Sequence, residues 1–224
     1  MNFRSIVAIG KKDLRIEFRT KQTITLMFLF AFIALLMFSF ATEPFSPTLQ
    51  DVGPGLLWFV LLFTGMLGLS RAFIKEREVG TLDGLRLTPA SGEDILVAKI
   101  IYNLILVFLI EIIAFPIFIA IFNYPIKEGI LLAIFILTLG NIGFIIVGSF
   151  MSALVMKART KEMVLQIIVF PLVLPIVILT ILALRKVLVF GDPLKYIGEV
   201  KLIVIYIIIM ATLSLLLFDY VLEE

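Results

Sequence analysis

The sequence predicts an all-α integral membrane protein, built as one transmembrane domain over residues 1–224. Of the 224 residues, 62% are hydrophobic and 16% are charged, whereas soluble globular domains are roughly 45–50% apolar and about 25% charged. The mean hydropathy is +1.17. The apolar residues also gather into six long stretches that carry few charges. Six transmembrane helices are therefore expected, together with an interfacial amphipathic helix at the N-terminus and a short cytoplasmic coupling helix.

The six spans are predicted from stretch length. A helix needs about 20 apolar residues to cross about 30 Å of hydrocarbon. Each stretch is apolar on all sides, which indicates helices that face lipid or lie inside a bundle. The expected spans are about 23–42, 53–74, 96–122, 129–156, 163–184 and 202–219.

Residues 1–22 are predicted to form an amphipathic helix that lies in the membrane interface. Its apolar and basic residues fall mostly on different faces: Phe3, Val7, Leu14 and Phe18 on one, with Lys11, Lys12, Arg15 and Arg19 mostly elsewhere. Such a helix can rest on acidic lipid headgroups. The alternative is that these basic residues only set the membrane topology.

The distribution of basic residues predicts the orientation. Fourteen of the 19 Lys and Arg residues lie on the side that holds both ends of the chain, and five lie on the other side. The positive-inside rule then places both termini in the cytoplasm. A multi-pass protein of the plasma (cell inner) membrane is expected. Three of the five exceptions lie at 185–195, so the 185–201 connection is the weakest point of this topology.

Residues that are missing from the sequence exclude several kinds of chemistry. The chain has no cysteine and no histidine, which excludes disulfides, Cys-ligated metals and histidine acid–base catalysis. It also lacks the G-x-x-x-x-G-K-[ST] phosphate loop, since Gly10-Lys11 has Ser5 where the first glycine should be. The chain is expected to be a non-catalytic membrane subunit that does not hydrolyse ATP itself.

The connection at 75–95 is predicted to be a structured coupling loop on the cytoplasmic side. Gly80 can end a helix that leaves the membrane, and a short amphipathic segment follows with Leu82 and Leu85 on one face. Ser91 begins the next span in a capping-box pattern. The alternative is an ordinary solvated loop.

Several strings resemble one family of membrane proteins over most of the chain. The segment EREVGTLDGLRLTP, followed by ILVAK, resembles the first cytoplasmic loop of type-2 ABC export permeases. The order and spacing of further strings resemble the CcmB-type permeases of cytochrome c maturation. These strings are Glu43-Pro44, Gly53-Pro54-Gly55-Leu56-Leu57-Trp58, Arg71-Ala72-Phe73, Gly80-Thr81-Leu82-Asp83, Leu139-Gly140, Gly143-Phe144, Gly148, Pro171-Leu172 and Pro175.

The resemblance implies a permease subunit of an ABC transporter in c-type cytochrome biogenesis. It implies a homodimer, a peripheral CcmA-like ATPase that binds the ATP, and CcmC-like and CcmE-like partners that handle haem. ATP hydrolysis would drive either haem export or release of the haem-loaded chaperone. The residues expected to dock the ATPase are Glu76, Arg77, Glu78, Gly80, Thr81, Leu82, Asp83 and Leu85.

Two alternatives to this function remain open from the residues. One is another type-2 ABC exporter, for a drug, lipid or glycan. The other is an ATP-independent carrier or channel, which would usually show more polar residues within its spans. No cofactor is expected on this chain, because haem iron is held by His, Cys, Met or Tyr. The first two do not occur here, and most methionines lie in apolar spans where packing explains them.

Within the spans, three groups of residues are candidate structural or functional sites. Small residues permit close helix approach, either within the bundle or at a dimer seam: Gly140, Gly143, Gly148, Ser149 and Ser152. Pro171 and Pro175 lie on one face and should bend the fifth span. Glu111 is a carboxyl group deep in a span, where a charge is costly. Asn103 and Asn141 are its possible hydrogen-bond partners.

Overall fold

The computed structural model describes residues 2–42, 47–73, 80, 84, 88, 90–124, 129–156, 160–190 and 197–223. Its regular structure in these ranges is entirely helical, which confirms the predicted all-α class. The helices are α1 (Phe3–Thr20), α2 (Gln22–Ala41), α3 (Pro47–Ala72), α6 (Gly92–Phe122), α7 (Ile130–Val155), α8 (Lys161–Phe190) and α9 (Ile197–Glu223).

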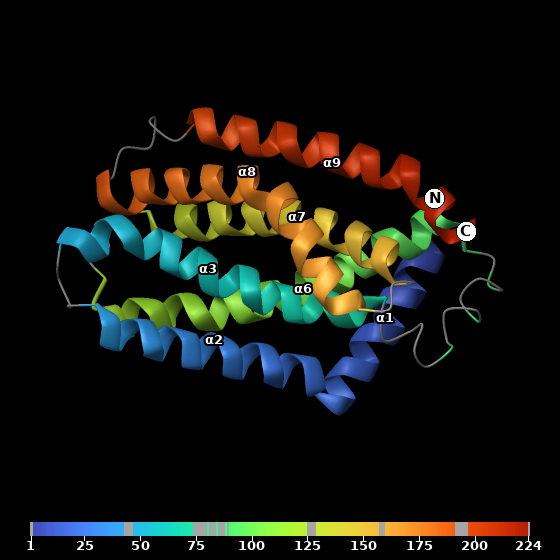
Figure 1. The fold of residues 1–224 in the computed structure, drawn as a ribbon, viewed down its shortest axis with the longest axis horizontal. Helices are drawn as coiled ribbons and strands as arrows, with labels where there is room; N and C mark the ends of the chain where they lie inside the picture. The colour runs from blue at the N-terminus through green and yellow to red at the C-terminus, as the bar shows by residue number, and fades with distance from the viewer. Residues whose placement is uncertain are drawn as a thin grey trace.

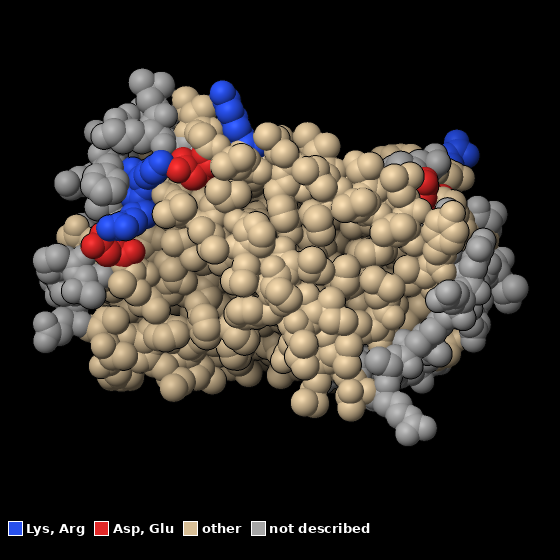
Figure 2. All heavy atoms as spheres, turned by 45° about the horizontal axis from the view of Figure 1, so that its top comes forward, with Lys and Arg blue, Asp and Glu red and all other residues tan. Residues whose placement is uncertain are grey.

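Six of these helices, α2, α3, α6, α7, α8 and α9, are long and apolar enough to cross a membrane. They form an elongated bundle, and α1 lies at the end that also carries both termini (Figure 1). We call this end the termini end and the other the opposite end. On the face that Figure 2 shows, charged side chains gather toward the two ends, and a broad belt of uncharged residues lies between them.

The helices differ from the predicted spans mainly where they begin and end. The third predicted span starts earlier, at Gly92, because Ser91 caps the helix there. The fifth continues through Arg185 and Lys186 to Phe190, so these two residues belong to α8 and not to a connection. Both basic side chains pair with acids on neighbouring helices. Hydropathy alone does not detect such pairs, so it ended the predicted span before these residues.

The amphipathic helix α1 packs against α6 with a face that hydropathy did not single out. Asn2 caps α1, and its side-chain oxygen accepts a hydrogen bond from the Arg4 N–H. The buried residues of α1 are Ile6, Ile9, Gly10, Asp13 and Glu17. By contrast, Phe3, Val7 and Phe18 of the predicted apolar face are exposed. That apolar face is therefore available to the membrane interface, while a partly acidic face binds the bundle.

Helix α7 lies at the centre of the bundle and packs against α3, α6, α8 and α9. Its second half is almost entirely buried. Aromatic side chains fill the space around it, as where the Trp58 ring of α3 meets the Phe144 ring edge-on at 6.4 Å. Helices α2 and α9 lie at the periphery, and most of their apolar side chains point outward. Such a bundle buries its small residues in α7 and presents large apolar ones to lipid.

Candidate functional site

The predicted ATPase-docking residues are only partly within the described chain. Glu76, Arg77, Glu78, Thr81, Leu82, Asp83 and Leu85 lie outside the described residues. Gly80 is described, and its φ of 74° is the left-handed conformation that glycine adopts readily at a helix end. The two flanks of the loop are also described. They are Phe73, directly after α3, and Ser91, directly before α6.

The predicted capping box at the start of α6 is confirmed. The Ser91 hydroxyl accepts a hydrogen bond from the Asp94 N–H at 3.3 Å, and the Asp94 carboxylate accepts one from the Ser91 N–H at 3.2 Å. The other Asp94 oxygen accepts a hydrogen bond from the Asn2 N–H at 2.8 Å. The same carboxylate thus caps α6 and holds the first turn of α1.

A buried ion pair also joins α1 to α6, further along both helices than the contact between Asn2 and Asp94. Lys99 Nζ lies 2.8 Å from Asp13 Oδ2, and the two residues are only 2% and 8% exposed. Lys99 Nζ also lies 5.7 Å from the centre of the Phe73 ring, within the range of a cation–π contact. Lys99 of α6 therefore contacts Phe73, the first flank of the coupling loop, as well as Asp13 of α1.

Glu17 fastens α1 to the first turn of α2. Its carboxylate accepts hydrogen bonds from the Thr23 N–H at 2.6 Å, the Ile24 N–H at 3.0 Å and the Thr23 hydroxyl at 2.7 Å. These are backbone donors that a helix N-terminus leaves unpaired, so an acidic side chain there is favourable. Lys21 takes the left-handed conformation between the two helices, with φ 54°.

We call the set formed by Asn2, Asp13, Glu17, Thr23, Asp94 and Lys99 the α1 latch. Sequence reasoning missed it, although the sequence carried a signal. Asp13 and Glu17 stand four residues apart in an otherwise basic segment, which puts both acids on one helical face. Lys99 begins an apolar run, where an unpaired charge is costly.

The structure pairs Glu111 with one of its two expected partners. Glu111 is 1% exposed, and one of its carboxyl oxygens accepts a hydrogen bond from the Asn141 side-chain amide at 2.7 Å. Asn103 does not contact Glu111, and instead donates to the Ser149 hydroxyl at 3.2 Å. Thr138 is a partner that the sequence did not suggest, with its hydroxyl 3.2 Å from the second Glu111 oxygen. The polar groups therefore divide into a trio, Glu111 with Asn141 and Thr138, and a pair, Asn103 with Ser149, and both sets join α6 to α7.

The five small residues of α7 pack inside this bundle. A Cβ added to Gly140 would meet Thr180 and Trp58 at 2.6 Å, and one added to Gly148 would overlap Leu69. Gly143 faces Ile176 of α8 in the same way. Ser152 donates to the Leu69 carbonyl at 2.9 Å, and Ser149 binds Asn103. Their positions explain the close approach of α7 to its neighbours, and none of the five is on the outer surface.

Helix α8 contains both prolines of the fifth predicted span and remains one helix. It changes direction along its length in Figure 1. The Tyr206 hydroxyl of α9 donates to the Leu172 carbonyl at 2.6 Å. Leu172 lies between the two prolines, next to the Pro171 carbonyl that the missing Pro175 N–H leaves without its usual donor. A side chain of α9 thus binds the backbone in the proline-containing part of α8.

At the opposite end, two basic residues that depart from the charge rule are both paired with acids. Arg185 donates from two of its nitrogens to Asp51 at 2.6 and 3.1 Å, and Lys186 forms an ion pair with Glu199. The Tyr124 hydroxyl donates to the Gln50 carbonyl at 2.7 Å. Burial raises the pKa of Tyr124 to about 12, so the phenol remains a donor at neutral pH. The two ion pairs join α8 to α3 and α9, and the Tyr124 hydrogen bond joins the end of α6 to α3.

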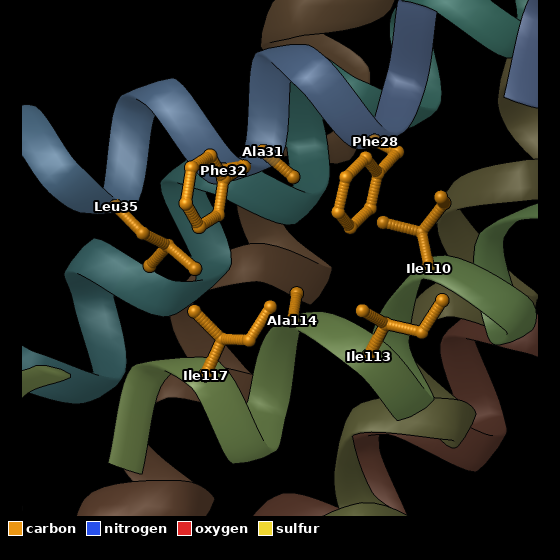
Figure 3. A pocket seen from close by; sticks show the side chains of 8 residues that line it. All are labelled: Phe28, Ala31, Phe32, Leu35, Ile110, Ile113, Ala114 and Ile117. Atoms are coloured by element: carbon orange, nitrogen blue, oxygen red, sulfur yellow. The ribbon is translucent and has the colours of Figure 1, made fainter. Parts of the chain in front are cut away.

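A small hollow between α2 and α6 is lined only by apolar residues. Its volume is about 10 Å³, about the space of one water molecule. Figure 3 shows side chains of the two helices facing each other across it. Its lining residues are Phe28, Ala31, Phe32, Leu35, Ile110, Ile113, Ala114 and Ile117. Without polar groups in its lining, this hollow offers no contact that would orient a ligand.

The fold and these sites define a multi-span helical membrane protein whose polar side chains mostly join one helix to another. No group of three or more acidic side chains is placed to hold a metal ion within the described ranges. The profile of the family described as CcmB protein matches residues 4–221. The chain therefore belongs to the CcmB protein family, as its sequence strings suggested.

Curated relatives support the same assignment over most of their length. A protein of Paracoccus denitrificans is 28% identical over 204 residues, covering 91% of each chain. One of Rhodobacter capsulatus is 27% identical and covers 76% of this chain and 78% of its own. A shorter match, to a protein of Escherichia coli, is 28% identical over 41% of this chain and 42% of its own. Each of the three is named Heme exporter protein B.

Proposed function

We propose that this chain is the permease subunit of an ABC complex in the biogenesis of c-type cytochromes, which couples ATP hydrolysis to haem export or to release of the haem-loaded chaperone. The observation that carries the proposal is the family match over residues 4–221, together with relatives named Heme exporter protein B. A peripheral CcmA-like subunit binds and hydrolyses the ATP, since this sequence has no phosphate loop of its own. The permease acts as a homodimer in the inner membrane.

The α1 latch supports a route for mechanical coupling. Residues 75–90 connect α3 to α6, and the ATPase binds there. Lys99 of α6 contacts Phe73 after α3 and Asp13 of α1, so one buried amine links α6 to the end of α3 and to the interfacial helix. A displacement of the loop therefore moves α1, α3 and α6 together. ATP turnover then favours one arrangement of the spans over another, which changes the affinity of the complex for a partner.

Haem itself is held by CcmC-like and CcmE-like partner chains in this proposal. This chain has neither histidine nor cysteine, and a stable site would need a methionine or tyrosine pair. Among the described tyrosines, Tyr124 and Tyr206 already donate hydrogen bonds to backbone carbonyls. The driven step is haem movement or release of the haem-loaded chaperone. To test this, the chain is purified with its ATPase alone, mixed with haem and desalted. A stoichiometric Soret band that is lost on substituting one Met or Tyr would contradict it.

The docking of the ATPase is tested by its co-purification. Leu82→Asp together with Leu85→Asp should abolish binding of the ATPase while the permease still inserts and purifies. The matched control is Ile126→Asp in the connection predicted on the other side of the membrane, which should leave the complex intact. Full ATPase binding by the double variant would show that the loop is not the docking site. That result would leave the proposed role in cytochrome c biogenesis untouched.

A further inference from the structure

The outer surface of α1 carries charge of one sign only. Asp13 and Glu17 are the only acids of this helix, and the α1 latch buries both of them. The basic residues of α1 all remain exposed, and they are Arg4, Lys11, Lys12, Arg15 and Arg19. The latch thus turns a helix of mixed charge into a purely cationic surface.

Three of these cations form a stripe that faces away from the bundle. Arg4, Lys11 and Arg15 lie within about 40° of one another around the helix axis, at about 100° per residue. We call them the basic stripe. Its centre lies about 160° around the axis from the centre of the buried face. Within the described ranges, no acid forms an ion pair with any of the three. The basic stripe is therefore open to a ligand from outside the bundle.

An apolar stripe lies between the basic stripe and the buried face. It consists of Phe3, Val7 and Phe18, which are 77%, 46% and 48% exposed. These side chains lie about 100° around the axis from the buried face, so the bundle does not cover them. Beside the cations, α1 thus offers a surface that water solvates poorly.

Contacts at both of its ends hold α1 at the level where two spans begin. Only Lys21 separates α1 from α2, and Glu17 binds the first turn of α2. At the other end, the Asn2 N–H donates to Asp94 in the first turn of α6. Between these contacts, α1 runs obliquely across the long axis of the bundle (Figure 1). Its outer surface therefore lies at the depth of lipid headgroups.

The two stripes together match an amphiphile with an anionic head. An acidic protein surface would match the basic stripe but leave the apolar stripe in water, whereas a phospholipid covers both. We propose that the basic stripe binds the headgroups of anionic phospholipids in preference to zwitterionic ones, while the apolar stripe lies against their acyl chains. The α1 latch maintains this site, because it keeps Asp13 and Glu17 away from the headgroups. The site does not depend on the proposed function.

The preference is tested on the full chain in nanodiscs of equal parts phosphatidylglycerol and phosphatidylcholine. Phe18→Trp places a fluorescent reporter in the apolar stripe. The chain's own tryptophan, Trp58, is buried, and the unchanged protein gives its signal as background. Bromine, which quenches tryptophan on contact, is carried on the acyl chains of one lipid or the other. Brominated phosphatidylglycerol should quench the reporter more strongly. The local excess should be at least about fivefold, the factor that one basic residue contributes near an anionic surface.

Paired variants test whether the charges of the basic stripe cause this preference. Lys11→Gln with Arg15→Gln should bring the local ratio of the two lipids close to one. Lys11→Arg with Arg15→Lys keeps both charges and should keep the preference. Lys201→Gln removes an exposed charge at the start of α9, at the opposite end, and is the control that should change nothing.

If the double Gln variant does not fold, the reporter protein is measured in about 1 M salt, which screens charges beyond about 3 Å. The preference should then be lost. Equal quenching by the two lipids at low salt would leave the basic stripe to an acidic protein partner. A preference that survives the Gln substitutions or high salt would place the selection of lipid elsewhere on the chain. Either result overturns the proposal.

Discussion

Lys99 of α6 and Asp13 of α1 form an ion pair of 2.8 Å in which both residues are almost completely buried. The pair is separated by 86 residues in the sequence. Removing one partner of a buried pair leaves an uncompensated charge and costs about 3–5 kcal/mol. We therefore expect Asp13→Leu to lower the free energy of unfolding by about this amount, as measured by thermal or denaturant unfolding in detergent.

The double variant Asp13→Leu with Lys99→Met separates the charge penalty from lost packing. It should recover most of the stability, because no buried charge is left without a partner. Lys12 also lies 3.1 Å from Asp13, but its side chain is 42% exposed, so Lys12→Ala should change stability by less than about 1 kcal/mol. A single Asp13 variant that unfolds like the unchanged protein would show that the latch does not hold α1 to the bundle.

Gly140 is expected to tolerate no side chain. A Cβ there would lie 2.6 Å from both Thr180 Oγ1 and Trp58 Cζ2. Neither neighbour can yield, because the Thr180 hydroxyl binds the Ile176 carbonyl and the Trp58 ring packs on Phe144. Gly140→Ala should therefore destabilise the protein by about 1–3 kcal/mol, the usual range for overpacking. Thermal unfolding in detergent measures this loss.

Gly55 provides the matched control for this substitution. It also lies in a spanning helix, but a Cβ there meets no atom within 4 Å. Gly55→Ala should raise stability by about 0.5–1 kcal/mol, because alanine loses less backbone freedom in a helix. Equal effects at both positions would mean that α7 does not approach α3 and α8 as closely as the structure shows.

Glu111 is expected to serve a structural role through its hydrogen bonds. Glu111→Gln keeps an acceptor for the Asn141 amide and should be tolerated. Glu111→Leu leaves that amide without its acceptor and should lower stability in detergent by about 1–3 kcal/mol. Ile112→Leu changes an exposed neighbour on the same helix and should have little effect. A Gln variant that assembles normally but blocks cytochrome c maturation would show that ionisation of Glu111 matters.

The topology is testable because the chain has no cysteine of its own. Single cysteines are introduced at Pro47, Ile126, Gly84 and Arg159 and treated in whole cells with a membrane-impermeant maleimide. The first two positions should be labelled from outside, and the last two only after the membrane is opened. This follows from placing fourteen of the 19 basic residues in the cytoplasm. External labelling at Gly84 would reverse the orientation.

The sequence by itself determined the six spanning helices, because the length of an apolar stretch and the thickness of the bilayer decide whether a helix can cross. It also determined the cap at Ser91, since a capping box is made within four consecutive residues. The resemblance to the CcmB family was also visible without the tertiary structure, because it rests on short sequence strings and their order. Each of these features is local, so neighbouring residues are sufficient to specify it.

Only the tertiary structure decided which polar groups meet. The spacing of Asp13 and Glu17 shows that they share a helical face, but not that Lys99 and the first turn of α2 lie opposite that face. Likewise, Asn103 and Asn141 were equal candidates for Glu111 until the packing of α6 on α7 gave Asn141 the contact. The physical reason is that helix rotation and depth are set by side-chain packing between helices. Hydropathy measures transfer into the membrane, which is nearly the same for any rotation of an apolar helix.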